Sequence, residues 1–266
     1  MLIDAHNISL DVPDMGHRLL FGQRRKLVIL KNVSLSVERG ETVGIVGESG
    51  SGKTSIGRTL LRLNEPSAGQ LLFDGTDITH LGQAALKPLR RRMQMIFQDP
   101  QSSLNPRRTI GSILGGALAL HGLDASDKAL SALVKRVGLP AQVLRRYPHQ
   151  LSGGQRQRVG IARAIGLKPD FVVADEIVSG LDVSTQAQVL DLLKGLRAEM
   201  GLSLAFISHD LSVIRHICDR IVIMRGGEIV ETGGTADTFR QPKTGYTRTL
   251  IAAIPLPEPD ENWLNS

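Results

Sequence analysis

A glycine-rich segment near residue 50 constrains this chain more than any other feature. It reads Gly47-Glu48-Ser49-Gly50-Ser51-Gly52-Lys53-Thr54 and fits the pattern G-x-x-x-x-G-K-[ST], the phosphate-binding P-loop. An apolar, β-branched run over 41–46 precedes it, and a helical pattern of isoleucine and leucine over 56–63 follows it. This order predicts a strand, a tight turn and a helix, which is how a P-loop α/β core begins.

Each residue type in this loop suits a phosphate chain. Glycine takes backbone angles that a Cβ would forbid, so amide N–H groups and the start of the next helix can face an anion. We expect Lys53 to reach the β- and γ-phosphates and the Thr54 hydroxyl to bind Mg²⁺. By itself the motif leaves kinases, GTPases and motor ATPases open. The plain alternative is a turn without a ligand, and a chance match in a chain of this length is about a one-in-a-hundred event.

Composition is typical of a soluble globular protein. The 266 residues are 41% hydrophobic and 22% charged, enough for one large α/β domain or a core with a smaller lobe. No apolar run approaches the length that spans a bilayer, and residues 1–6 lack the features of a signal peptide. The single cysteine, Cys218, excludes an intrachain disulfide, and we expect it to pack in the core. These observations favour a cytosolic protein.

The net charge of +6 is compatible with two kinds of anionic partner, nucleic acid and anionic lipid. The basic residues fall in short clusters rather than in one long block, and aromatic residues make up only 3% of the chain. Aromatic platforms on which bases could stack are therefore missing. We expect no nucleic acid partner, and we interpret Arg90, Arg91 and Arg92 as a solvated or membrane-facing cluster.

The segment 99–151 differs from the rest of the chain, because it shows helical patterns without strand signals. Its helices are expected over 109–120, 125–137 and 141–146. Elsewhere strands are expected over 2–12, 27–37, 41–46, 71–73, 93–97, 171–176, 204–207, 221–224 and 228–230. Another helix is expected to open at 151–155 and to carry the apolar residues up to Ile165, and further helices are expected over 184–200, 211–217 and near 246–253. The pattern predicts an α/β core over 1–98 and 152–266, with a tail from about 233, and a helical subdomain over 99–151.

Two carboxylates and a second glycine-rich segment narrow the chemistry. Asp175 ends an apolar strand, where a carboxylate can hold Mg²⁺, and Glu176 beside it can accept a proton from an attacking water or orient that water. A second anion cradle, with a serine hydroxyl and backbone donors, runs through Leu151, Ser152, Gly153, Gly154 and Gln155. One phosphate chain cannot easily use both cradles of one chain. A symmetric dimer resolves this, because each cradle would face the other cradle of its partner, with ATP between them.

Taken together, these motifs resemble the nucleotide-binding subunits of ATP-binding cassette (ABC) transporters over nearly the whole chain. Six motifs stand in the family's order and spacing. They are Gly47–Thr54 as Walker A, Gln98 as the Q-loop glutamine, Leu151–Gln155 as the signature, Phe171–Asp175 as Walker B with Glu176 as the catalytic glutamate, Ser179–Asp182 as the D-loop, and His209 as the switch histidine. The resemblance implies a RecA-like P-loop NTPase core, with an N-terminal antiparallel β region, that binds ATP and Mg²⁺ and hydrolyses ATP.

The resemblance also implies roles for individual residues. Glu176, His209 and Gln98 would serve catalysis, and Thr54, Gln98 and Asp175 would hold the metal. The nucleotide would lie against the Walker A residues, Ser55 and Asp182, while the partner's signature segment closes over the γ-phosphate. No motif marks the aromatic residue that stacks on adenine, and Phe21 is our candidate for it.

Two more stretches, 102–107 and 245–255, resemble the oligopeptide, dipeptide and nickel importers. In those systems two ATPase subunits pair beneath two membrane-spanning subunits, and a separate solute-binding protein delivers the cargo. The resemblance implies a peripheral subunit on the cytoplasmic face of the inner membrane that powers peptide uptake. Nickel or another small solute is the alternative cargo, because Ile177-Val178 replaces the usual Pro-Thr, as in some nickel-type subunits. Gly180 also replaces the usual alanine, and the tail lacks a cysteine cluster for an iron–sulfur centre.

The rival class is a soluble ABC-type ATPase that acts on nucleic acid or the ribosome, which the positive charge favours weakly. Such proteins usually carry two cassettes or a long coiled-coil insert, and this chain has neither. A P-loop small-molecule kinase would leave Leu151–Gln155 unexplained. Both a homodimer and a heterodimer of ATPase subunits stay open.

Overall fold

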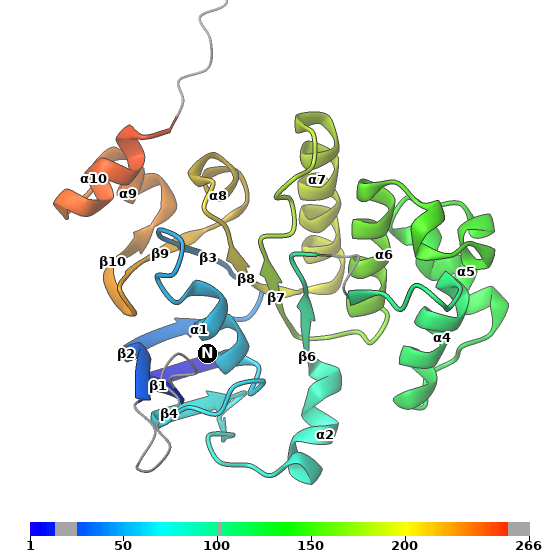
Figure 1. The fold of residues 1–266 in the computed structure, drawn as a ribbon, viewed down its shortest axis with the longest axis horizontal. Helices are drawn as coiled ribbons and strands as arrows, with labels where there is room; N and C mark the ends of the chain where they lie inside the picture. The colour runs from blue at the N-terminus through cyan, green and yellow to red at the C-terminus, as the bar shows by residue number, and fades with distance from the viewer. Residues whose placement is uncertain (14–25, 100–102, 255–266) are drawn as a thin grey trace, which may run out of the picture.

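The computed structural model describes residues 1–13, 26–99 and 103–254, and Figure 1 shows how its elements are arranged. An antiparallel sheet lies near the N-terminus in the strand order β2, β1, β4, β5. These strands span Lys26–Val37, Ile3–Pro13, Ala68–Phe73 and Thr76–Asp77, respectively. Ile3 and Ala5 of β1 are both buried on the same face, as the two-residue period of a strand requires.

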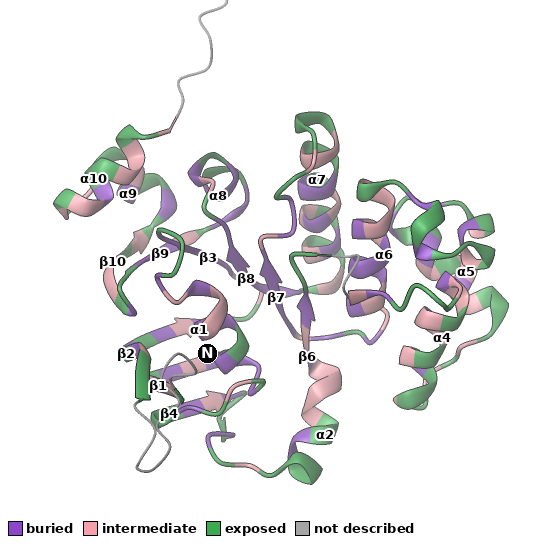
Figure 2. Cartoon of the chain, in the orientation of Figure 1, coloured by how far each residue is buried: buried purple, intermediate pink, exposed green. Residues whose placement is uncertain are grey.

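A second sheet forms the centre of the molecule, in the order β10, β9, β3, β8, β7, β6. Neighbouring strands are parallel except β10, which pairs antiparallel with β9. In the same order the strands span Glu228–Gly234, Arg220–Arg225, Thr42–Val46, Ser203–Ile207, Phe171–Asp175 and Met93–Ile96. Strands β3, β7 and β8 are buried along their whole length (Figure 2). Because they are parallel, their carboxyl ends meet at one edge, where open α/β sheets bind ligands.

The two faces of the central sheet pack against different layers. Phe171 and Val173 of β7 belong to one hydrophobic cluster with α1 (Lys53–Leu60) and the antiparallel sheet. Val172 and Ala174 of the same strand belong to a second cluster, with α6 (Gly153–Ile165), α7 (Val183–Met200) and α8 (Leu211–Ile217). The uninterrupted apolar run that predicted this strand therefore reflects burial on both faces.

Beyond β6 the chain forms a helical group at one side of the molecule (Figure 1). It contains α4 (Ile110–Leu120), α5 (Asp127–Arg136) and two 3₁₀ turns, η1 (Ala141–Arg145) and η2 (Pro148–Gln150). The described residues between 103 and 150 contain no strand. The α/β fold with an antiparallel N-terminal region is confirmed, while the exact division at 99–151 stays a prediction.

Two short helices were missed by the sequence analysis. Helix α2 (Gln83–Arg92) contains Pro88, and among its residues only Leu86 is buried, so it carries neither uninterrupted helix formers nor an apolar face. Helix α9 (Thr235–Arg240) buries only threonines, which give no hydrophobic period. Helix α10 (Gly245–Ala252) lies next to α9 in the view of Figure 1, close to where we expected it.

Arg90, Arg91 and Arg92 are partly exposed, and they also bind the core, which the interpretation as a solvated or membrane-facing cluster did not foresee. Arg90 donates to the carbonyl oxygen of Leu61 at 2.6 Å. Arg92 pairs with Asp170 at 2.6 Å and with Asp74 at 2.7 Å. These bonds fasten α2 and β6 to the turn after α1 and to the antiparallel sheet. Sequence spacing does not reveal them, because each acceptor comes from a distant part of the chain.

Cys218, directly after α8, is buried as expected, and burial raises the pKa of its thiol. Across the described ranges, no helix combines the length and the apolarity that a bilayer crossing needs.

The contact of α8 with β3 leads to a stability prediction. A Cβ on Gly44 would lie 2.9 Å from Ile214 Cγ2 and 3.0 Å from the Cys218 sulfur. We expect Gly44→Ala to lower the free energy of unfolding by about 1–3 kcal/mol, because α8 must move away from the sheet. Urea denaturation followed by circular dichroism measures this change.

The control is Gly195→Ala, on an exposed face of α7 where a Cβ meets no atom within 4 Å. Alanine has a higher helix propensity than glycine, so this substitution should raise the free energy of unfolding by up to about 1 kcal/mol. Equal stability of Gly44→Ala and the unmodified protein would contradict the described packing.

Candidate functional site

The loop between β3 and α1 is packed so closely that two of its positions accept only glycine. A Cβ on Gly47, whose φ is +152°, would lie 2.2 Å from the carbonyl oxygen of Met224 at the end of β9. A Cβ on Gly52, whose φ is +99°, would lie 2.9 Å from a methyl group of Leu30 on β2. Both sheets therefore fix the path of the loop, and its third glycine, Gly50, has open space around its missing Cβ.

Lys53 is the buried cation of the loop, with a relative exposure of 6%. Its ammonium donates to the carbonyl oxygens of Gly47 at 2.9 Å and Glu48 at 2.8 Å. Burial lowers the pKa of Lys53, and the carboxylates of Glu176 and Asp175 oppose this effect. The hydrogen bonds of this buried ammonium go to neutral carbonyl groups, so a phosphate oxygen could replace them with stronger, charge-assisted bonds.

Ser51 adds an unsatisfied hydroxyl to the same loop. Its Oγ is buried and has no hydrogen-bond partner among the described residues. Buried polar atoms in folded proteins are nearly always paired, so an unpaired hydroxyl in this loop is a free contact for a ligand or a water molecule. Together with Lys53 it shows that the loop fits a phosphate group.

Asp175 ends β7 beside the first turn of α1. It is buried, and it accepts a hydrogen bond of 3.0 Å from the Thr54 hydroxyl. Burial raises the pKa of Asp175, while the bond from Thr54 lowers it. A hydroxyl and a carboxylate that face each other are oxygen ligands of the kind that Mg²⁺ takes. The described residues contain no group of three or more acidic, histidine or cysteine side chains arranged to hold a metal ion. Mg²⁺ often binds through one or two protein oxygens together with waters and substrate phosphates, and the Thr54–Asp175 pair fits that kind of site.

Glu176 contacts two other predicted site residues, Gln98 and His209. Its carboxylate accepts a hydrogen bond of 2.9 Å from the Gln98 amide, and its other oxygen lies 3.5 Å from His209 Nδ1. Gln98, Glu176 and His209 follow β6, β7 and β8, which are neighbours in the sheet. Glu176 also has a φ of +46°, and its amide donates to the Ile207 carbonyl at 2.9 Å. A left-handed conformation is costly for a glutamate, so this side chain is held in place by its surroundings.

The second cradle is a well-formed helix start. Ser152 caps α6, because its hydroxyl accepts from the Gln155 amide at 3.3 Å while the Gln155 side chain accepts from the Ser152 amide at 3.1 Å. Leu151 is buried, whereas Ser152 and Gly153 are exposed. A Cβ on Gly154 would lie 2.5 Å from Thr185 Cγ2 on α7, so the two helices approach closely here.

The Asp182 carboxylate already accepts hydrogen bonds from within the chain. It caps α7 by accepting from the Thr185 amide and hydroxyl, both at 2.8 Å, and these bonds lower its pKa. The neighbouring side chain, Val183, is 85% exposed although it is apolar. The segment that begins α7 thus presents an apolar residue next to the exposed start of α6.

The structure does not bring the two cradles together. Helix α1 and the start of α6 lie apart in Figure 1, with β7 and β6 between them. The predicted site residues therefore fall into two groups, which we name the first and the second candidate half-site. The first contains Lys53, Thr54, Asp175, Glu176, Gln98 and His209, and the second contains Leu151–Gln155 with Asp182. Phe21 and its expected adenine contact lie outside the described residues.

The sequence analysis missed one residue that touches the loop. Tyr246 of α10 accepts a hydrogen bond of 3.3 Å from the Glu48 amide. The stretch around Tyr246 was noted only for its resemblance to importer tails, and no spacing rule connects it with the P-loop 198 residues earlier.

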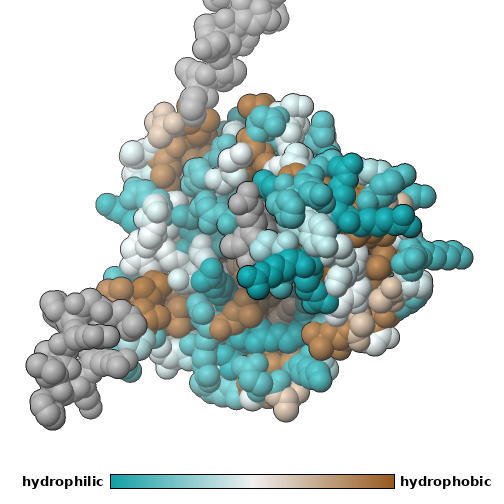
Figure 3. Space-filling model, turned by 45° about the vertical axis from the view of Figure 1, so that its right-hand side comes forward, coloured by the Kyte–Doolittle hydropathy of each residue, from teal (hydrophilic) through white to brown (hydrophobic). Residues whose placement is uncertain are grey.

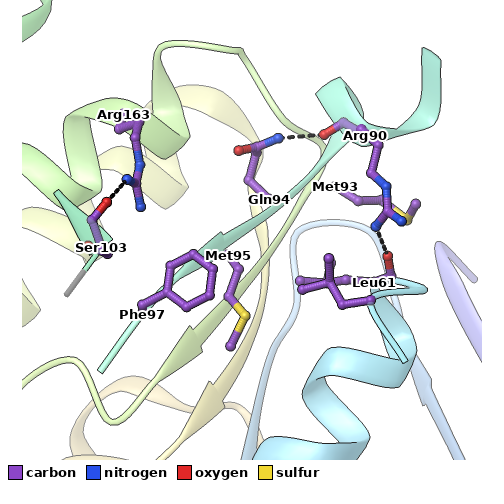
Figure 4. Close-up of a pocket in the computed structure, with 9 residues that line it drawn as sticks. Leu61, Arg90, Met93, Gln94, Met95, Phe97, Ser103 and Arg163 are labelled. Carbon is purple, nitrogen blue, oxygen red and sulfur yellow. Dashed lines mark hydrogen bonds between the residues drawn. The ribbon is translucent and has the colours of Figure 1, made fainter. Parts of the chain in front are cut away.

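A groove with a cavity volume of about 530 Å³ lies beside the half-site that contains Gln98. Residues from the turn after α1, from β6 and from α6 line it (Figure 4). Arg163 crosses the groove from α6, donates to the Ser103 carbonyl at 2.5 Å and lies 5.9 Å from the centre of the Phe97 ring. Hydrophobic and hydrophilic residues are mixed in small groups over the face shown in Figure 3.

Comparison with known sequences gives a consistent result. A family profile described as ABC transporter matches residues 30–179. A protein of Brucella ovis with the provisional name of a peptide import ATP-binding protein is 53% identical over 237 residues, which are 88% of this chain and 75% of its own length. The oligopeptide transport ATP-binding protein AmiF of Streptococcus pneumoniae is 48% identical over 245 residues, which are 90% of this chain and 80% of its own length.

Solved structures agree with this result. The ATP-binding cassette MJ0796, in a dimeric post-hydrolysis state bound to ADP and Pi, has a TM-score of 0.77 at 29% identity. The match covers 88% of this chain and 98% of the cassette. The cbiO1 protein of Clostridium perfringens, part of the transporter complex cbiONQ, has a TM-score of 0.74 at 24% identity, covers 90% of this chain and 91% of its own, and shares the fold.

Proposed function

Because this chain belongs to the ABC transporter ATPases, we propose that it binds ATP with Mg²⁺ and that its hydrolysis of ATP powers the import of peptides. The observation that carries the proposal is the meeting of Gln98, Glu176 and His209 beside the pair formed by Thr54 and Asp175. The names of the relatives support peptides as the cargo. Nickel or another small solute is the alternative cargo.

In the proposed site, the loop amides and Lys53 bind the triphosphate, Ser55 continues the first turn of α1, and Thr54, Asp175 and Gln98 hold the metal. Bound Mg²⁺ supplies positive charge that neutralises the β- and γ-phosphate oxygens. Asp175 stays a carboxylate there, because a cation favours its charged form against the effect of burial.

Glu176 is the proposed base that orients the attacking water and accepts its proton at a carboxylate oxygen. The Gln98 amide fixes one oxygen of that carboxylate, and His209 stands next to the other. His209 is 60% exposed, so the γ-phosphate side of the site is open in a single chain. A second subunit would cover this side and exclude water.

We propose that the covering surface is the exposed start of α6 from a second ATP-binding subunit, either an identical copy or a homologue. Ser152 and the α6 amides would face the γ-phosphate across the interface, as a helix start favours an anion. Val183 and Asp182 lie next to this surface, and burial of an 85% exposed valine would stabilise the pairing. The dimeric cassette among the similar structures supports this arrangement.

The groove of Figure 4 is the proposed docking site for a membrane-spanning permease subunit. A pair of ATPase subunits would thus bind two permease subunits, one in each groove. It offers apolar contacts through Phe97 and Leu63, which are 36% and 48% exposed. Gln98 follows Phe97 directly, so a change in the groove reaches the Glu176 carboxylate through one side chain. The ATPase would then lie on the cytoplasmic face of the inner membrane, and a solute-binding protein would act only indirectly.

The first test replaces the proposed base. Glu176→Gln should slow ATP hydrolysis by at least about 100-fold, because an amide accepts no proton, while ATP binding persists. The variant should accumulate as an ATP-loaded dimer, seen by size-exclusion chromatography with ATP. The control is Glu199→Gln, which removes a carboxylate that pairs with Arg136 away from the site. Normal turnover by Glu176→Gln would show that Glu176 is not the base.

The second test addresses the second half-site. Ser152→Ala should reduce hydrolysis about 100-fold, because one donor to the γ-phosphate is lost, while the isolated subunit retains its ATP affinity. Ser126→Ala is the matched control, since Ser126 caps α5 through the same bond, to the Ala129 amide at 3.3 Å. Joint loss of binding and hydrolysis in Ser152→Ala, or equal losses in both variants, would contradict the dimer.

The third test concerns the permease partners. The tagged chain, expressed together with the membrane subunits of its operon, should co-purify with two of them in detergent. Phe97→Asp should reduce the recovery of these subunits at least about tenfold, because a charge enters an apolar contact. Leu120→Asp is the control, at an exposed leucine of α4 outside the groove. Recovery of nucleic acid or ribosomes instead would favour the soluble ATPase class.

A further inference from the structure

Helix α10 touches the phosphate-binding loop, although nearly the whole length of the chain separates them. The Tyr246 hydroxyl accepts a hydrogen bond from the Glu48 amide at 3.3 Å. Glu48 is exposed, and it follows Gly47, whose position is fixed by the end of β9. Tyr246 therefore supplies a tertiary contact at the point where the loop leaves the sheet and becomes exposed.

The peptide groups on either side of the Glu48 Cα connect Tyr246 to Lys53, the lysine proposed to bind phosphate. While the Glu48 amide donates to Tyr246, the Glu48 carbonyl accepts from the Lys53 ammonium at 2.8 Å. The same carbonyl also accepts from the Ser51 amide at 3.2 Å. A displacement of Glu48 would therefore move the acceptor that holds Lys53 and would loosen the turn that carries Ser51.

The position of Tyr246 is itself fixed from two sides. The guanidinium carbon of Arg225 lies 4.9 Å from the centre of its half-buried ring, a distance suited to a cation–π contact. The start of α10 is tied to β10 through Glu231, which is only 6% exposed. Glu231 accepts from the amides of Lys243 at 2.9 Å and Thr244 at 3.0 Å.

Glu231 is ionised in this arrangement. Burial would raise its pKa, but hydrogen bonds from the Thr247 hydroxyl, at 2.5 Å, and from the two amides outweigh burial and lower the pKa. A charged carboxylate that accepts three bonds makes a strong local link between β10 and α10. The helix therefore holds Tyr246 against the loop as a fixed part of the fold.

We propose that Tyr246 is a positioning residue for ATP binding, which fixes the Glu48 peptide so that the loop and Lys53 are arranged before the triphosphate enters. This inference rests on the proposed function of the loop. Preorganisation of a binding loop raises affinity because less freedom is lost on binding. The docking of α10 then sets the affinity for ATP, while the hydrolysis machinery around Glu176 is untouched.

The test is Tyr246→Phe, which removes the hydroxyl and keeps the ring under Arg225. Titration of the full chain with a fluorescent ATP analogue should show a Kd about 3- to 10-fold higher, the loss expected for one neutral hydrogen bond. At saturating ATP, kcat should stay within about twofold of the unmodified protein, because no group at Glu176 changes. The melting temperature of Tyr246→Phe should stay close to that of the unmodified protein.

Thr249→Ala is the matched control on α10. In the part of the chain that the structure describes, the Thr249 hydroxyl donates to the Gly245 carbonyl of the same helix, at 3.1 Å. Its Kd for the analogue should equal that of the unmodified protein. An unchanged Kd in Tyr246→Phe, or equal losses in both variants, would overturn the proposal.

A double-mutant cycle with Glu231→Gln separates positioning from general damage. If α10 acts on the loop through Tyr246, Glu231→Gln should raise the Kd, and adding it to Tyr246→Phe should raise the Kd little further. Independent, additive losses would overturn the proposal. The unmodified protein tests the proposed function separately. If it does not bind the ATP analogue, the proposed function is refuted. If it binds and Tyr246→Phe binds equally well, only the role of Tyr246 is refuted.

Discussion

The candidate site depends on parallel strands that end at one edge of the central sheet. Gln98, Glu176 and His209 come from three distant parts of the sequence, yet each follows one of three neighbouring strands by one or two residues. Strand β3 pairs with β8 in the same sheet, so the P-loop opens at the same edge. A different strand order would separate the lysine from the carboxylates. The chemistry of the site is therefore a consequence of sheet topology before it is a consequence of any single side chain.

Burial gives this edge its electrostatic character. Burial disfavours the charged form of both Lys53 and Asp175, lowering one pKa and raising the other. The opposite charges of Lys53 and of Asp175 with Glu176 oppose this effect of burial, but the hydrogen bonds of the Lys53 ammonium go to neutral carbonyl groups. A triphosphate with its cation would complete both. The site is open on one side, where His209 is exposed, and the second cradle lies elsewhere in the fold.

Parts of the chain that look peripheral in the sequence support the site from outside. The arginines of α2 fasten that helix to backbone carbonyl groups and carboxylates of the core. Arg163 connects α6, which begins with the second cradle, to the segment after Gln98 through the Ser103 carbonyl. Tyr246 connects the C-terminal helix to the P-loop. Each contact ties an element that is remote in sequence to the candidate site or to a segment next to it.

The sequence by itself determined the local elements and predicted the residues of both candidate half-sites. The glycine spacing of the P-loop, the apolar run before Asp175 and the helix start at Ser152 are local patterns, and the structure places a strand, a turn or a helix at each of them. The tertiary structure decided which residues meet, because pairings such as Gln98 with Glu176 and Tyr246 with Glu48 follow from strand order and helix docking. It also decided that the arginines of α2 bind carbonyl groups and carboxylates of the core. The helices α2 and α9 themselves became visible only in the structure, because their short, polar sequences carry no hydrophobic period. Local propensity acts over a few residues, whereas these contacts depend on the packing of segments remote in sequence.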